Sequence, residues 1–542
     1  MKHILSIFFL FFMVMPAQAA EYSLNIARQP VNITGKTVSK ITVNGSIPAP
    51  TLKFKDGEDV VIHVTNNMDV PSSIHWHGIL LAGKMDGVQG FNGYPGIAPG
   101  KTFTYRFKIR QTGTYWYHAH SMGQEQDGLY GSLIVAPNGT DPIKADRDYV
   151  VVLSDFSDEE SDEILANLKM ASDYYNYARR TVGDFFTDAE KNGFKKAWKN
   201  AKDWGEMRMS PTDLADVSDY TFLINGKTAV QNWTGIFKPG ERVRLRFINA
   251  SSMSFYDVRI PGLKMDVVQA DGQNIEPLKI DEFRFAPAET YDVIVTPKED
   301  RAYTIAAEPI DRTGFALGSL APRDGMKGAP PQQRARALLT MGDMGMDHME
   351  MMHSSGTTMT MEEMKSGWAE TGTPPGDKAL RYADLRYAGI QKDTRPPERE
   401  IDVRLGGNME RYIWTLNGKK YEDSEPINLR YGERVRLKFT NETMMAHPMH
   451  LHGMFVQLEN GQPAEKLPNK HTVIIPPGQS YAVLLTADEP GEWAFHCHLL
   501  YHMMSGMMNK VVVAKFDPSY RPPAQKPMPM KQEMKGHQHH VH

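Results

Sequence analysis

Three stretches of the chain share one alternation of apolar and polar residues. They cover residues 43–67, 224–250 and 416–442, and each runs from an Asn-Gly pair through a Gly-Glu turn into an alternating segment that closes on an asparagine. Alternation beside glycine-containing turns is typical of antiparallel strands with one buried face. The repeat therefore predicts an all-β chain of three β-sandwich domains.

A second repeat links only the first and third of these domains. "APGKTFTYRFKIRQTGTYWYHAH" ends at His120, and "PPGQSYAVLLTADEPGEWAFHCH" ends at His498, with the same spacing from the Pro-Gly pair to the first histidine. The corresponding stretch of the middle domain, "APAETYDVIVTPKEDRAYTIAAE", has no histidine pair. We expect the middle domain to provide spacing and support.

Two internal segments depart from the strand pattern. Residues 157–205 open with Ser157 and Glu160 in capping-box spacing, which predicts a helical insertion in the second domain. Residues 321–399 are rich in proline, glycine and methionine and read as a linker or excursion. We predict a signal peptide at residues 1–20 and sandwich domains at 21–144 and 145–320. After the excursion at 321–399, a third sandwich domain follows at 400–516, and a His-rich tail at 517–542.

The first 20 residues predict export. A basic residue, an apolar run from Ile4 to Met15 and a small-x-small site at residues 17–19 are typical of a secretory signal peptide. No later stretch reaches the roughly 18 uninterrupted apolar residues of a membrane span, so no stable membrane insertion is expected. We expect a periplasmic protein that follows a Sec-type route.

Charge and cysteine content narrow the possibilities further. The formal net charge of -4, with both signs interspersed, argues against a nucleic-acid or anionic-membrane partner. The single cysteine, Cys497, cannot form an internal disulfide. It is either a free thiol with a chemical purpose or a buried apolar filler.

Ten of the 19 histidines fall into four short motifs. In a strand, residues i and i+2 point to the same face, so each His-x-His pair can offer two imidazoles to one cleft. The residue between them points the other way, which puts Cys497 on the opposite side from its neighbours. The motif histidines are His75, His77, His118, His120, His447, His450, His452, His496, His498 and His502.

The cysteine side can form a metal site of its own. Two imidazoles, a thiolate and a thioether make the blue-copper arrangement, and His447, His502 and Met507 could join Cys497 in it. A single His-x-His pair is more often coincidence or a zinc-like site. Four motifs at the ends of repeated strands, in two of three domains, favour copper.

On these motifs the chain resembles the multicopper oxidase family over nearly all of the mature sequence. The resemblance implies three cupredoxin-like Greek-key β-sandwich domains and four copper ions: one type 1, one type 2 and two type 3. The ligands it implies are His447, Cys497, His502 and Met507 for type 1; His75 and His450 for type 2; His77, His118 and His498 for one type 3 ion; and His120, His452 and His496 for the other.

The resemblance also implies an activity. Four one-electron oxidations of a reductant would be coupled to reduction of dioxygen to water, with Cys497 as the electron path. Asp86 matches the position of the acidic residue that delivers protons in relatives; its plain alternative is a turn residue of an Asp-Gly pair. Relatives commonly have a carboxylate between the second type 1 histidine and the axial ligand, whereas this chain has Met503, Met504, Ser505 and Gly506.

The methionines suggest the substrate. Residues 341–364 contain nine of them together with His348 and His353. Thioether sulfur is a soft ligand suited to Cu(I), although a low-complexity linker is the alternative. The chain resembles in particular the copper resistance protein A branch of the family, whose members have a Met-rich segment. It departs from that branch in having no arginine pair near Met1, which favours copper loading outside the cytoplasm.

Two functions from different classes fit these features. The first is an exported oxidase for copper tolerance that converts Cu(I) to Cu(II), with phenols as a second class of reductant. The second is a copper-sequestering protein that protects through its Met-rich and His-rich segments. A complete ligand set favours the oxidase, because sequestration does not require one. Dioxygen, Cu(I) and other exported copper-handling proteins are the expected partners.

Overall fold

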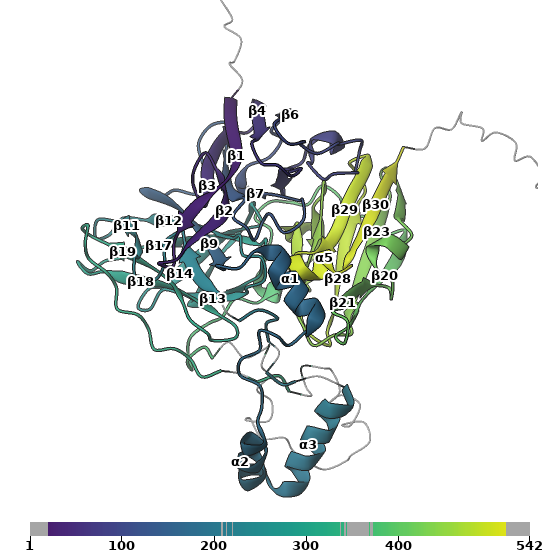
Figure 1. The fold of residues 1–542 in the computed structure, drawn as a ribbon. Coiled ribbons are helices and arrows are strands. Elements are labelled where there is room, and N and C mark those ends of the chain that lie inside the picture. The colour runs from purple at the N-terminus through teal and green to yellow at the C-terminus, as the bar shows by residue number, and fades with distance from the viewer. Residues whose placement is uncertain are drawn as a thin grey trace, which may run out of the picture.

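The computed structural model describes residues 20–207, 210–212, 214–218, 220–336, 338–340, 343, 368 and 372–515. Three β-sandwiches succeed one another along the chain and pack together, as the purple, teal and yellow-green parts of Figure 1 show. The predicted fold class is thereby confirmed. Residues 1–19 of the predicted signal peptide, the whole predicted His-rich tail (517–542) and the Met-rich stretch 341–364 apart from Asp343 lie outside the described residues.

The first sandwich consists of β1 (Ala20–Asn32), β2 (Thr37–Val43), β3 (Ala49–Lys55), β4 (Asp59–Asn66), β5 (His75–His77), β6 (Thr102–Lys108), β7 (Gly113–His118) and β8 (Tyr130–Ala136). They form two four-stranded sheets, β2-β1-β4-β6 and β3-β8-β7-β5. The alternating pattern decides which side chains face inward: in β4, Val60, Ile62 and Val64 are buried in the core between the sheets.

The second sandwich consists of β9 (Arg147–Phe156), β10 (Thr221–Ile224), β11 (Trp233–Ile236), β12 (Val243–Asn249), β13 (Tyr256–Arg259), β14 (Met265–Ala270), β15 (Gln273–Ile280), β16 (Glu282–Phe285), β17 (Thr290–Val295), β18 (Tyr303–Pro309) and β19 (Ala316–Ala321). Its sheets have the orders β10-β9-β12-β17-β14-β15 and β11-β19-β18-β13-β16.

The third sandwich consists of β20 (Arg399–Asn408), β21 (Ile413–Leu416), β22 (Ile427–Arg430), β23 (Arg434–Asn441), β24 (His447–Leu451), β25 (Val456–Leu458), β26 (Asn469–Lys470), β27 (Thr472–Ile475), β28 (Ser480–Thr486), β29 (Gly491–Cys497) and β30 (Met508–Ala514). Its sheet orders, β21-β20-β23-β28-β25-β26 and β22-β30-β29-β24-β27, repeat those of the second sandwich strand for strand. The repeat in the sequence thus corresponds to a repeated topology, while the predicted domain limits stay predictions.

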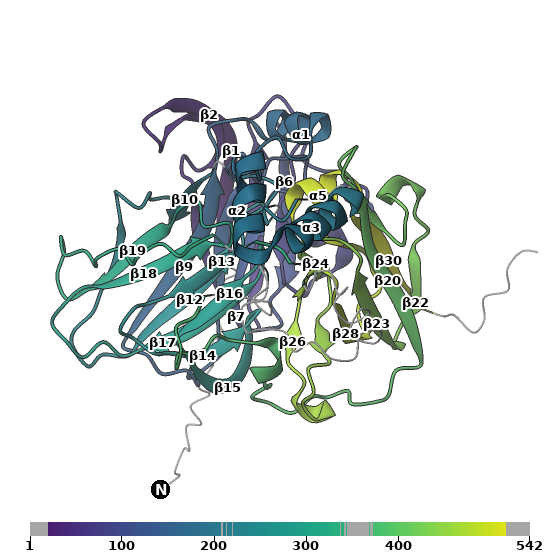
Figure 2. The same cartoon turned by 90° about the horizontal axis from the view of Figure 1, so that it is seen from below.

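Helices interrupt the sandwiches in two places. Between β9 and β10 lie α1 (Ser161–Met170), α2 (Val182–Asn192) and α3 (Phe194–Met207); α5 (Leu500–Met504) joins β29 to β30. Short 3-10 turns are η1 (Gly83–Met85), η3 (Tyr382–Asp384), η4 (Tyr421–Asp423) and η5 (Ala464–Lys466). Helices α2 and α3 stand apart from the sandwiches in Figure 1, and in the view from below they lie in front of them (Figure 2). No helix in the described parts of the chain is long and apolar enough to cross a membrane.

The predicted capping box at Ser157 and Glu160 is wrong. Helix α1 begins at Ser161, and the hydroxyl of Ser157 accepts instead from the backbone N–H of Glu159 (3.1 Å). Asp127 of the first sandwich accepts the backbone N–H of Ser161 at 3.0 Å, so the helix is capped by a residue from another domain. A local sequence motif cannot predict a cap that the tertiary structure provides.

The middle sandwich has charged residues at two positions where the third sandwich has histidines. The shared strand pairing equates Arg259 with His450 and Glu308 with His498. Arg259 and Glu308 form an ion pair at 2.7 Å. Beside them, buried Asp257 binds Arg284 (2.8 Å) and Arg312 (2.6 Å). Paired charges therefore occupy the two positions at which the third sandwich has His450 and His498.

We expect Asp257→Asn to destabilise the middle sandwich by about 3–5 kcal/mol, because it leaves buried guanidinium groups unpaired. The matched control is Glu299→Gln, which breaks an exposed pair with Arg301 and should cost less than about 1 kcal/mol. Differential scanning calorimetry of the two variants measures the effect. Equal, small shifts in both would contradict the importance of the buried pair.

Candidate metal centre

Histidine-bearing strands of the first and third sandwiches face one another. In the first sandwich, pairing of β5 with β7 sets His75 opposite His118; in the third, pairing of β24 with β29 sets His450 opposite His496. Across the contact, the rings of His75 and His452 have centroids 3.8 Å apart, as do those of His77 and His450. We call this group the eight-histidine cluster; neither domain alone forms it. Its members are His75, His77, His118, His120, His450, His452, His496 and His498.

The nitrogens of the cluster are arranged for a metal rather than for hydrogen bonds. The Nε2 atoms of three histidines converge: Nε2 of His496 lies 3.3 Å from Nε2 of His120 and 3.1 Å from Nε2 of His452. Five further buried ring nitrogens have no hydrogen-bond partner among the described residues: Nε2 of His75, His118, His450 and His498, and Nδ1 of His77. Unpaired buried nitrogens are rare and costly, so the cluster fits a bound metal. Several triplets of these histidines have ring nitrogens within 4.8 Å of one another.

Burial favours the neutral form of seven of the eight cluster histidines. Desolvation, followed by repulsion from neighbouring imidazoles, lowers the pKa well below the usual value for His77, His118, His120, His450 and His452. The same causes lower the pKa of His496 and of His498 to about 3. A neutral imidazole keeps a free lone pair, which is the form that binds a metal.

Carboxylates behind the cluster set the orientation of the rings. Asp86 is buried; its Oδ2 accepts Nδ1–H of His452 at 2.8 Å and its backbone oxygen accepts Nδ1–H of His75 at 2.9 Å. It thereby joins ligands from two domains. Glu125 lies 2.7 Å from Nδ1 of His118, and burial raises its pKa well above the usual value. The sequence analysis missed Glu125, although it follows the His118-Ala119-His120 motif by only five residues.

A second, smaller group surrounds the cysteine. Sγ of Cys497 lies 3.5 Å from Nδ1 of His447 and 3.8 Å from Nδ1 of His502, and the two nitrogens are 3.1 Å apart. Met507 is fully buried, and its backbone oxygen accepts the N–H of Cys497 at 3.1 Å. Burial raises the pKa of the Cys497 thiol, so a metal that binds there must displace the thiol proton. Two nitrogens and a soft sulfur fit a blue-copper ion.

The middle sandwich contributes to this smaller group. Asp216 accepts Nε2–H of His502 at 2.7 Å and the hydroxyl of Tyr412 at 2.6 Å. Trp414 stacks on the other side of the His502 ring, with centroids 3.8 Å apart. The middle domain was expected to provide spacing and support, and the contact of Asp216 with His502 shows what that support consists of. Asp216 lies outside the strands and belongs to none of the histidine motifs, so the sequence analysis did not identify it as part of a site.

The three sandwiches, the Cys497 group and the eight-histidine cluster together define a copper protein of the cupredoxin type. Three sequence models, each described as multicopper oxidase, match residues 25–140, 147–321 and 394–517. The chain belongs to the multicopper oxidase family. It is accordingly an oxidoreductase that handles copper and uses copper cofactors.

Relatives with similar sequences cover nearly the whole chain. Copper resistance protein A of Escherichia coli is 44% identical, over 92% of this chain and 93% of that protein. Multicopper oxidase MmcO of Mycobacterium tuberculosis is 31% identical, over 92% and 88%. Among solved structures, a laccase from Botrytis aclada has a TM-score of 0.66 at 23% identity, over 91% and 87%, which shows the shared fold.

We expect Cys497→Ser to abolish the intense visible absorption and the turnover of the copper-loaded protein. A serine hydroxyl cannot supply the soft thiolate on which this absorption depends. Visible spectroscopy and copper analysis measure the change, and circular dichroism is the control for an intact fold. Because the eight-histidine cluster is untouched, its copper should remain. A variant that keeps the visible band would contradict the role of Cys497.

Proposed function

We propose that the protein is an exported oxidase for copper tolerance, which oxidises Cu(I) to Cu(II) and reduces dioxygen to water. Phenols are a second class of reductant. The observation that carries this proposal is the complete set of nitrogen and sulfur ligands in two separate groups. The 44% identity to Copper resistance protein A supports the link to copper tolerance.

Four copper ions are the cofactors in this proposal. His447, Cys497, His502 and Met507 would hold a type 1 ion; His75 and His450 a type 2 ion; His77, His118 and His498 one type 3 ion; His120, His452 and His496 the other. Bound copper would supply one-electron redox chemistry at the Cys497 group and dioxygen reduction at the cluster. Support comes from the nitrogens that face inward without partners.

Cys497 connects the two groups through covalent bonds. Its neighbours in the chain, His496 and His498, belong to the cluster, while its own side chain joins His447 and His502. Electrons that enter at the Cys497 group therefore have a short covalent route through β29 to the cluster.

The surroundings of Asp216 favour Cu(I) as the reductant. A few residues before Asp216, the backbone oxygen of Pro211 accepts the N–H of Leu339 at 2.8 Å. Asp343 accepts the backbone N–H of Trp368 at 3.3 Å, so the two ends of the Met-rich stretch leave from one place. The hydrogen bond between Leu339 and Pro211 connects these ends to the segment of Asp216, which contacts His502. This connection supports delivery of thioether-bound Cu(I) to the Cys497 group.

Replacing the nine methionines of residues 341–364 by leucine should lower kcat/KM for Cu(I) about tenfold and leave kcat/KM for a phenol unchanged, because only Cu(I) uses thioether ligands. Oxygen uptake with each reductant, at matched copper content, measures the ratio. Deletion of residues 344–364 is the second variant; it leaves three residues to join Asp343 to Trp368.

Other results would contradict this proposal in distinct ways. Equal losses with both reductants would mean damaged copper loading, and no loss with either would make the segment a linker. Cu(I) binding without oxygen uptake by the parent protein would favour the sequestering alternative over the oxidase.

Asp86 is proposed as the proton donor to the cluster, since its carboxylate is buried against His452 and His75. We expect Asp86→Asn, which keeps an acceptor oxygen but no acidic proton, to slow reoxidation by dioxygen about 100-fold. Anaerobic reduction of the visible band by substrate should keep its rate. Stopped-flow absorbance separates the two steps. Unchanged reoxidation would leave Asp86 with an orienting role only.

A further inference from the structure

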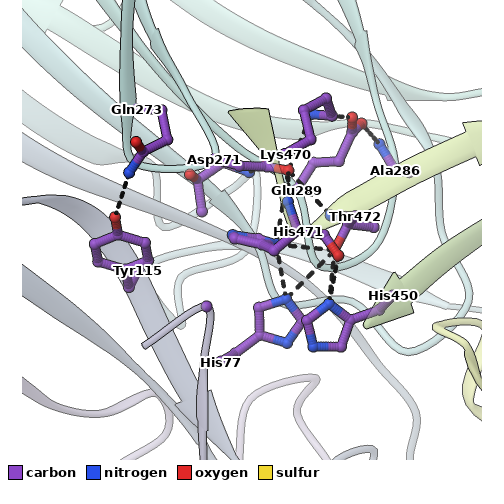
Figure 3. Close-up of polar contacts among 12 residues, drawn as sticks. His77, Tyr115, Asp271, Gln273, Ala286, Glu289, His450, Lys470, His471 and Thr472 are labelled. Carbon is purple, nitrogen blue, oxygen red and sulfur yellow. Dashed lines mark hydrogen bonds and ion pairs between the residues drawn. The ribbon is translucent and has the colours of Figure 1, made fainter. Parts of the chain in front are cut away.

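A histidine outside the four motifs lies against the cluster where the three sandwiches meet (Figure 3). His471 joins β26 to β27 and is 2% exposed. Its ring centroid is 4.6 Å from that of His77 in the first sandwich and 5.6 Å from that of His450 in the third. It is not part of any His-x-His pair, so the sequence pattern did not reveal it.

His471 contacts both of these cluster histidines through different atoms. Its ring Nδ1 lies 3.2 Å from Nε2 of His77. Its backbone oxygen accepts Nδ1–H of His450 at 2.7 Å. In each case the contacted nitrogen is the one that faces away from the centre, because the unpartnered nitrogens are Nδ1 of His77 and Nε2 of His450.

His77 has an unusual requirement. Of the five unpartnered cluster nitrogens, four are Nε2 atoms, and only that of His77 is Nδ1. An imidazole that binds a metal through one nitrogen carries its proton on the other, and that N–H needs an acceptor when it is buried. Nε2–H of His77 therefore requires an acceptor behind the ring, at the position that Nδ1 of His471 occupies.

The middle sandwich holds His471 in place. Asp271, in the turn between β14 and β15, accepts the backbone N–H groups of His471 and Thr472, each at 3.1 Å, and binds Lys470 at 3.1 Å. In Figure 3, Asp271 lies above His471, and the two cluster histidines, His77 and His450, lie below it. The ring itself packs against Gly78, where a Cβ would come within 2.6 Å of Cδ2 of His471. The backbone is thus held by Asp271, and the ring packs closely against the chain at Gly78 on one side.

We propose that His471, anchored by Asp271, is a positioning residue for the cluster. Its ring Nδ1 accepts a hydrogen bond from Nε2–H of His77, and its backbone oxygen accepts one from Nδ1–H of His450. One residue thereby sets which nitrogen of each ligand faces the metal. The proton of the His471 ring is then on its own Nε2, which has no partner among the described residues. This inference rests on the copper ligands of the proposed function. The middle sandwich contacts the Cys497 group through Asp216, and this inference gives it a second role, at the eight-histidine cluster. In our assignment it provides no ligand to that cluster.

Thr472 is the competing acceptor. Its hydroxyl oxygen lies 3.4 Å from Nε2 of His77 and 3.4 Å from Nδ1 of His450, and 3.0 Å from Nδ1 of His471. Nδ1 of His471 is closer to His77, and the backbone oxygen of His471 is closer to His450. The hydroxyl is therefore the poorer acceptor for both ligands. Because Nδ1 of His471 has a single lone pair, it accepts from Nε2–H of His77 only when the hydroxyl of Thr472 does not donate to it.

The test compares His471→Leu with His471→Asn in the full-length copper-loaded protein. Leucine removes the ring acceptor. Asparagine is similar in size to leucine but can place its Oδ1 near the position of Nδ1 of His471. We expect cluster copper in the leucine variant to be lost to a chelator at about 10- to 100-fold lower concentration. The asparagine variant and Thr472→Val should stay within about threefold of the parent. Copper per chain and the type 2 electron paramagnetic resonance signal measure the cluster; the visible band of the Cys497 group is the internal reference.

Three results would overturn the proposal. Parent-like cluster copper in the leucine variant would mean that His77 needs no such acceptor. Equal loss in the asparagine variant, or loss of the visible band as well, would indicate a packing effect. Loss in Thr472→Val equal to that in the leucine variant would assign the acceptor to Thr472. A parent protein that binds copper only at the Cys497 group would instead refute the proposed cluster, which separates the two failures.

Discussion

Eight imidazoles at the contact between the first and third sandwiches are the constraint on which the rest of the structure depends. Seven of them are buried and that of His120 is half-buried, and five present a ring nitrogen that has no hydrogen-bond partner among the described residues. Burying such atoms is unfavourable unless a metal binds them. The contact between the two domains is therefore completed by its cofactor, and binding of copper to the folded chain should add to its stability.

Carboxylates behind the imidazoles decide which of the two ring nitrogens carries the proton and which faces the metal. Asp86 accepts from His452 and Glu125 contacts His118, while Asp216 accepts from His502. Each contact occupies the nitrogen that faces away from a centre and so directs the other nitrogen inward. The absence of a carboxylate between His502 and Met507 does not leave the cluster without acidic groups, because Asp86 and Glu125 reach it from the first sandwich.

The middle sandwich illustrates how one topology can be used in two ways. Its strand order repeats that of the third sandwich, yet Arg259 and Glu308 form an ion pair where the third has His450 and His498. From its irregular segments, the same domain sends Asp216 to the Cys497 group and Asp271 to His471. A domain whose own core needs no metal can thus fix the geometry of two metal groups outside it.

The sequence alone determined the sandwich class, the repeat and the membership of the histidine motifs, because strand periodicity and His-x-His spacing are local properties. It could not determine the cap of α1, which Asp127 provides from another domain, nor the contacts of Glu125, Asp216 and His471. Those side chains have no distinctive spacing, and their partners are up to several hundred residues away in the chain. Glu125 reaches His118 within the first sandwich, through the loop after β7, whereas the contacts of Asp216 with His502 and of His471 with His77 form only when the sandwiches pack together. Such hydrogen bonds depend on tertiary position rather than on sequence pattern.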